Sequence, residues 1–171
     1  MKKLPILLLS CILGALLPAI AFAQVIEGTF AIKNVETSMV LRIKDANGAN
    51  GTQLVAYSPV NWKCVTWDFN HVAGQTYQLR NLFTNKTFQP ANGVASEGVL
   101  LEQQPLVRSR DNQLYDFILV EKNVYLVKAT GTDLYLTPFD KNGTTDTPIM
   151  LSAKNGSKLQ QWIIYLQKPT M

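Results

Sequence analysis

Apolar and polar residues alternate in short runs along this chain, with the two-residue period of strands that bury one face. Three such runs open on an aromatic residue and continue with alternating aliphatic and basic or polar residues: residues 30–34, 77–81 and 125–129. After each run comes a polar turn that holds a threonine, and then another apolar strand. No stretch after residue 23 has a convincing helical period. The pattern predicts an all-β chain with about four short strands per unit and about twelve in all.

The same unit returns three times. Its opening aromatics are Phe30, Tyr77 and Tyr125, and its closing aromatics are Trp67, Tyr115 and Trp162. The openings are 47 and 48 residues apart, and each closing aromatic follows its opening by 37 or 38 residues. Asn-Gly pairs between the runs favour the tight turns of hairpins. A period of this length predicts three structural repeats, at about residues 28–74, 75–123 and 124–167.

The first 23 residues have the composition of a cleaved signal peptide. Two lysines precede an apolar stretch from residue 4 to 20, and small residues at 21–23 predict cleavage before Gln24. Residues 24–171 would then form a single exported domain. The short leader with two lysines is typical of bacteria, so we expect a secreted or periplasmic protein. Lipoprotein anchoring through Cys11 is less favoured, because the apolar stretch continues well beyond it.

Charge and cysteine content exclude several classes of protein. The chain has 16 basic and 12 acidic residues, and loss of the leader would remove two lysines. The remaining surface is nearly balanced, which gives little support to nucleic-acid binding. No other stretch approaches the roughly 18 apolar residues of a membrane span. Cys64 would be the one cysteine left, so no intrachain disulfide is expected, and a small buried apolar role is favoured.

The sequence contains few residues suited to catalysis. His71 is the only histidine, which excludes a histidine metal cluster and leaves one imidazole for a nucleophile. Asp68 and Asp116 recur at matching positions after the closing aromatics, which favours a repeated structural contact over an acid/base pair. We therefore expect no enzyme activity, no catalytic residue, no metal and no cofactor.

The closing pattern resembles that of the ricin-type (ricin B-like) β-trefoil lectin superfamily, in which each repeat ends on glutamine-x-aromatic. Gln160-Gln161-Trp162 matches it, Gln113-Leu114-Tyr115 has Tyr for Trp, and Val65-Thr66-Trp67 keeps only the aromatic. The resemblance covers about residues 28–167. It implies a β-trefoil whose closing aromatics converge in the core.

The resemblance also implies where a sugar site would lie. In the family, an Asp on the second strand of a repeat accepts hydrogen bonds from sugar hydroxyls, and an aromatic at the end of the third strand stacks on the sugar. The Asp position holds Arg42, Gln89 and Thr137, and the aromatic position holds Tyr57, Gln103 and Ser152. The acid is absent from all three, and only the first repeat keeps the aromatic. Galactose binding of the ricin kind is therefore not expected in the second and third repeats.

The first repeat concentrates the remaining candidate ligand groups. They are Asp45, Asn50, Tyr57, Asn61 and Trp62. An exposed loop Trp is a suitable sugar platform, but Trp62 could instead plug the base of the barrel while the polar residues make turns. In the third repeat, Asp140, Asn142 and Asp146 are better explained as a solvated turn.

Two functions follow. The first is a secreted, non-catalytic carbohydrate-binding module whose partners are glycans or glycoconjugates. The second is a non-lectin trefoil that serves as a receptor-docking or protein-interaction subunit, with a partner toxin or cell-surface protein. Its layout is similar to that of the small exported trefoil subunits of bacterial cytolethal distending toxins. A protease-inhibitor trefoil is a weaker third alternative.

Overall fold

The computed structural model describes residues 25–170, which form twelve strands and five short 3-10 helices. The first repeat contains β1 (Gly28–Asn34), β2 (Val40–Ile43), η1 (Lys44–Ala46), β3 (Leu54–Tyr57), η2 (Lys63–Val65) and β4 (Trp67–Ala73). The second contains β5 (Thr76–Asn81), β6 (Thr87–Pro90), η3 (Ala91–Gly93), β7 (Leu101–Gln104), η4 (Asp111–Gln113) and β8 (Tyr115–Glu121). The third contains β9 (Val124–Ala129), β10 (Leu134–Pro138), β11 (Ile149–Ala153), η5 (Lys158–Gln160) and β12 (Gln161–Leu166). The expected signal peptide, with Cys11 and the cleavage site before Gln24, lies outside the described residues and stays a prediction.

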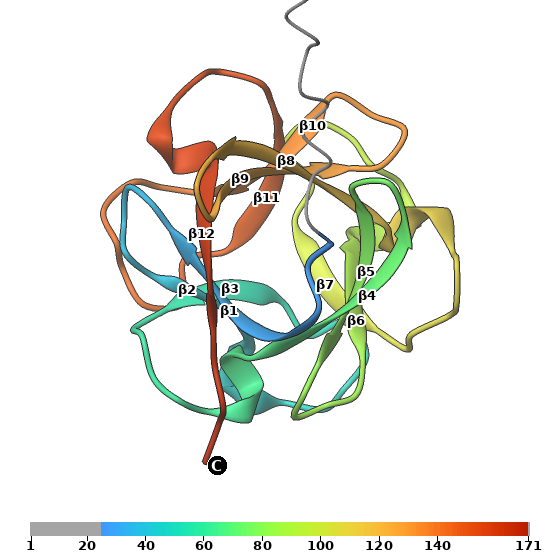
Figure 1. Cartoon of the computed structure of the whole chain (residues 1–171), viewed down its shortest axis with the longest axis vertical. Helices are drawn as coiled ribbons and strands as arrows, with labels where there is room; N and C mark the ends of the chain where they lie inside the picture. Colours follow the sequence, from blue (N-terminus) through green and yellow to red (C-terminus); the bar gives the residue numbers. More distant parts are fainter. Residues whose placement is uncertain (1–24, 171) are drawn as a thin grey trace, which may run out of the picture.

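Six strands close into a barrel. Strand β1 pairs with both β4 and β12, β4 with β5, β5 with β8, β8 with β9, and β9 with β12, all antiparallel. Each repeat thus contributes its opening and closing strands to the ring, and the three repeats follow one another around it from blue to red (Figure 1). Closure of the ring removes the unpaired strand edges that an open sheet would present.

The other six strands form three hairpins, β2–β3, β6–β7 and β10–β11, one in each repeat. Isolated bridges join each hairpin to its neighbour: Gln53 with Glu102, Val55 with Pro148, and Leu100 with Met150. A six-stranded barrel with three hairpins in threefold arrangement is the β-trefoil, so the all-β prediction is confirmed. The inter-repeat bridges also place residues of one repeat beside the ligand position of the next.

The closing aromatics are part of the core. Trp67, Tyr115 and Trp162 are almost completely buried, and each donates a hydrogen bond to a carbonyl of the second strand of its own repeat. The acceptors are Leu41 at 3.3 Å, Phe88 at 3.4 Å and Leu136 at 3.0 Å. Burial raises the pKa of Tyr115, so its hydroxyl stays protonated and can donate its hydrogen bond. These aromatics tie each hairpin to the barrel and leave no face for a ligand.

The recurring aspartates make equivalent ion pairs. Asp68 pairs with Arg80 at 2.8 Å, and Asp116 pairs with Lys128 at 3.5 Å, in both cases across two adjacent barrel strands. Their recurrence therefore reflects a repeated structural contact, as the sequence predicted. Cys64 is buried in a small apolar cluster, which agrees with the packing role expected for it.

Candidate functional site

An aromatic pair lies at the open end of the first hairpin. Tyr57 ends β3, and Trp62 lies in the loop just before η2. Their ring centroids are 6.4 Å apart, the rings are tilted by 34°, and both side chains are half-buried. Trp62 packs against a small apolar cluster that is separate from the main core and consists of Ala31, Val40, Cys64 and Val65. Trp62 therefore does not plug the barrel, and part of both rings remains accessible.

Arg42 covers one face of Tyr57. Its guanidinium carbon lies 3.9 Å from the centre of the Tyr57 ring. Arg42 is opposite Val55 in the β2–β3 pair, and Val55 and Tyr57 lie on the same face of β3 because alternate residues of a strand point the same way. The arginine thus extends along this face and forms a cation–π contact, which is worth about 0.5–2 kcal/mol. A ligand can reach only the part of Tyr57 that Arg42 leaves open.

The other predicted residues divide into two groups. Asp45 is exposed in η1, and its neighbour Ala46 packs against the same small cluster as Trp62. Asn61 adjoins Trp62, and its side-chain amide donates to the carbonyl of Lys168 at 2.9 Å. Asn61 also lines a hollow of about 600 Å³ beside Val60 and Tyr165. Asn50 is instead held by the second repeat, because its Oδ1 accepts a hydrogen bond from Nζ of Lys86.

The equivalent position in the third repeat is closed by its own residues. Thr137 and Ser152, at the family's Asp and aromatic positions, lie 2.6 Å apart through their hydroxyls. The buried closing glutamine, Gln160, donates to both hydroxyls, at 3.3 and 2.9 Å. These polar groups therefore satisfy one another and offer little to a ligand.

The second repeat is closed in a similar way. Gln113, its closing glutamine, is buried and donates to Oε1 of Gln89 at 3.0 Å. Gln103, at the aromatic position, donates to the carbonyls of Asn47 and Ala49 in the turn of the first repeat, at 2.7 and 2.6 Å. Both candidate ligand positions are thus used to hold hairpins together.

The first repeat lacks the closing glutamine that bonds to the ligand position in the other two repeats. Val65 stands where the other repeats have the closing glutamine, and its aliphatic side chain cannot accept a hydrogen bond. The Nε of Arg42 is buried without a hydrogen-bond partner. Within residues 25–170 the ion pairs are Arg80 with Asp68 and Lys128 with Asp116, so no described carboxylate lies within ion-pair distance of Arg42. The candidate site is therefore the Arg42, Tyr57 and Trp62 group.

Comparison with known families identifies the domain. Residues 21–106, half of the chain, match the model of the ricin-type beta-trefoil lectin domain-like family. The chain belongs to this family. A comparison with the curated proteins gives no significant match.

Solved structures of the same fold include lectins and a toxin. The Rhizoctonia solani agglutinin matches with a TM-score of 0.74 and 19% identity over 85% of this chain and 99% of that one. The Macrolepiota procera ricin B-like lectin, solved with lactose, matches with a TM-score of 0.66 and 19% identity over 83% and 98%. A mosquitocidal holotoxin matches with a TM-score of 0.74 and 18% identity, over 85% of this chain but 18% of the toxin. At these identities the likeness shows the fold alone.

This ricin-type domain brings one further residue to the first-repeat site. The backbone N–H of Asp146, from the third repeat, donates to the carbonyl of Ala56 at 2.8 Å, and Ala56 donates to the carbonyl of Thr147 at 2.8 Å. Strand β3 therefore lies between β2, which carries Arg42, and the segment that carries Asp146. The Oδ1 of Asp146 is also buried without a partner. The sequence favoured a solvated turn here, and the packing of Asp146 against the first repeat could not be inferred from its spacing.

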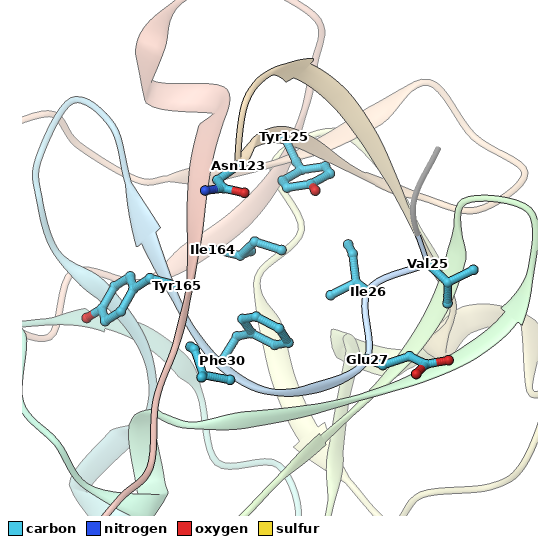
Figure 2. A pocket seen from close by; sticks show the side chains of 9 residues that line it. Val25, Ile26, Glu27, Phe30, Asn123, Tyr125, Ile164 and Tyr165 are labelled. Carbon is cyan, nitrogen blue, oxygen red and sulfur yellow. The ribbon is translucent and has the colours of Figure 1, made fainter. Parts of the chain in front are cut away.

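A separate hollow of about 610 Å³ lies at the end of the barrel where the chain enters β1. Phe30, Tyr125 and Ile164 come from three barrel strands and surround it, together with Ile26 (Figure 2). The N–H of Ile26 donates to the hydroxyl of Tyr77 at 3.0 Å, which holds this segment across the barrel opening. The hollow does not include the Arg42, Tyr57 and Trp62 group.

Membrane-spanning helices and metal-binding clusters are both absent from residues 25–170. No helix in this part of the chain has the length and apolarity to cross a membrane. Within the same residues, no three His, Cys, Asp or Glu side chains are grouped so that they could hold a metal ion.

Proposed function

We propose that the protein is a secreted, non-catalytic carbohydrate-binding module that recognises glycans through the first repeat. The observation that carries this proposal is the contrast among the three repeats. Side chains at the ligand positions of the second and third repeats donate or accept hydrogen bonds within the protein, although Oε1 of Gln103 has no partner, whereas the Arg42 guanidinium donates to no other described residue. Unpaired polar groups beside half-buried aromatic rings are the combination that a sugar needs, because a sugar offers hydroxyls and a weakly apolar face.

The site we propose centres on Arg42, Tyr57 and Trp62, with Asp45 and Asn61 at its border. Asn50 belonged to the set predicted from the sequence, and its bond to Lys86 makes it a peripheral member at most. The family membership and the lactose-bound Macrolepiota lectin support a sugar as the ligand class. The fold alone would not, since one fold hosts many functions.

A glycan array tests this proposal. We expect the wild-type protein to bind at least one class of glycan, and we expect Tyr57→Ala to lose most of that binding. Phe83→Ala is the matched control, because Phe83 is an exposed aromatic side chain of the second repeat and is not part of the Arg42, Tyr57 and Trp62 group. Failure of the wild-type protein to bind any glycan above background would contradict the proposal.

The second candidate is a docking subunit of a larger exported assembly, such as a toxin. The observation in its favour is that the same fold occurs as a part of the mosquitocidal holotoxin. Copurification from the native culture medium distinguishes the two candidates. A stable protein partner together with a blank glycan array would favour the docking subunit, and a solitary protein that binds glycans would exclude it.

A further inference from the structure

We infer that the first-repeat site takes an acidic sugar and that Arg42 binds the carboxylate of this sugar. The inference rests on the proposed glycan binding at the same site. It names the class of glycan and assigns a role to Arg42, which was not among the residues that the sequence singled out as ligands.

Hydrogen bonding at position 42 is the reverse of that at the equivalent position in the family. The family's Asp can only accept hydrogen bonds, whereas the guanidinium of Arg42 can only donate them. A ligand group opposite Arg42 must therefore accept. The best acceptor for a guanidinium is a carboxylate, because two parallel N–H···O bonds match its planar fork.

The charge of Arg42 is left uncompensated by the described residues. Arg42 is only 9% exposed, its Nε has no hydrogen-bond partner, and neither ion pair of residues 25–170 involves it. A buried charge without a partner is costly. The contact with Tyr57 uses the face of the guanidinium and offsets part of this cost, but it leaves the buried Nε–H without an acceptor. An anionic ligand would supply both the acceptors and the opposite charge.

The charges around the site also favour an anion. Lys44 follows the end of β2, Lys63 adjoins Trp62, and the carbonyl of Lys168 is bonded to Asn61. Three acids, Asp45, Asp140 and Asp146, belong to the same region, and Oδ2 of Asp140 accepts a hydrogen bond from the Thr147 hydroxyl. With Arg42 the basic residues number four against three, which is a small excess of positive charge.

Asp146 indicates that the anion is part of a sugar. Its buried Oδ1 has no partner and needs a donor, which a simple inorganic anion would not provide. A sugar acid provides both groups, because its carboxylate accepts from Arg42 and its hydroxyls can donate to Asp146. Strand β3 lies between Arg42 and Asp146, so their backbones are about two strand spacings, or roughly 10 Å, apart. One sugar ring and its substituents fit this span.

The test compares two sugars that differ in one group. Galacturonic acid has a carboxylate where galactose has a hydroxymethyl group. Each sugar is titrated into the protein and binding is monitored by NMR, so the difference in affinity isolates the contribution of the charge. We expect the wild-type protein to bind galacturonate, or another carboxylate sugar chosen from the array, about 10- to 100-fold more tightly than its neutral counterpart. Arg42→Met should remove this preference, and Arg42→Lys should keep only part of it because lysine lacks the fork.

Arg108→Gln is the matched control. Arg108 is exposed in the second repeat, so its loss changes the net charge equally but should leave the preference intact. Thermal melting of Arg42→Met without ligand checks the fold, and we expect a melting temperature close to that of the wild type, because the substitution removes an uncompensated charge. If Arg42→Met does not fold, Arg42→Lys still tests the inference through its effect on the preference.

The outcomes separate the inference from the proposed function. Equal binding of acidic and neutral sugars, unchanged in Arg42→Met, would overturn the inference while glycan binding stands. Binding of acetate or sulfate as tightly as the acidic sugar would overturn the assignment to a sugar. No binding of any glycan by the wild-type protein would overturn both proposals. A carboxylate preference lost with Arg42 but kept in Arg108→Gln would support the inference.

Discussion

Gln160 illustrates how a single side chain closes a potential ligand position. Its amide donates to Thr137, Ser152 and the carbonyl of Ala153, and its Oε1 accepts from the N–H of Asn155 at 2.9 Å. Gln160→Ala would leave these buried groups without a partner and create a cavity, so we expect a loss of about 3 kcal/mol in the free energy of unfolding, measured in urea. Lys158→Ala, on the same turn but exposed, should change it by less than about 0.5 kcal/mol. A similarly small effect at Gln160 would show that the network is not holding the repeat closed.

The first repeat differs from the others by equally small changes. Valine at position 65 removes the closing glutamine that bonds to the ligand position in the other repeats, and arginine at position 42 adds donors that need an acceptor. Residue types at these positions could be aligned from the sequence, and they correctly showed that the family's acid is missing. The partners of these side chains could not be derived, because hydrogen bonding in a buried position depends on side-chain direction and on neighbours distant in the chain.

At the scale of elements, the turn between β4 and β5 depends on a glycine. Gly74 has φ +52°, and a Cβ built on it meets nothing within 4 Å, so the cost of a side chain there is that of the backbone conformation alone. We expect Gly74→Ala to lower the free energy of unfolding by about 1–2 kcal/mol. Gly48→Ala is the control, because Gly48 is equally unhindered but its φ is outside the positive region. That variant should be neutral or slightly stabilising. Equal effects of the two substitutions in urea unfolding would contradict the argument.

The strands and their repetition were predictable because they follow from local pattern. Alternation located the barrel strands β1, β5 and β9, and the closing aromatics located β4, β8 and β12. Contacts between repeats were not predictable in this way. The pairing of Val55 with Pro148 brings Asp146 to the first repeat, and the repeat pattern alone does not show which residues of one hairpin face the next hairpin. The site therefore draws on two repeats, whereas the sequence suggested one.

The whole molecule is a closed ring, although its sequence is a tandem repeat. Strand β12 pairs with β1 along five residue pairs from Phe30–Leu166 to Asn34–Trp162, and Thr29 donates to the carbonyl of Gln167 at 2.8 Å. The first and last strands are therefore neighbours (Figure 1). In an open repeat array each unit contacts only adjacent units in sequence, and end units can unfold separately. Here every repeat contacts both others, so no repeat is an end.

This closure predicts that the protein unfolds in one cooperative step. The tryptophans allow a test, because Trp67 and Trp162 are buried in the first and third repeats and Trp62 is the remaining one. One variant, with Phe at 62 and 162, reports on Trp67, and a second, with Phe at 62 and 67, reports on Trp162. Each variant has its own stability, so its fluorescence transition in urea is compared with its own far-ultraviolet circular dichroism. We expect the two curves to coincide within each variant. A fluorescence transition that precedes the loss of β-structure in either variant would mean that one repeat opens independently, and that closure of the barrel does not couple the three repeats.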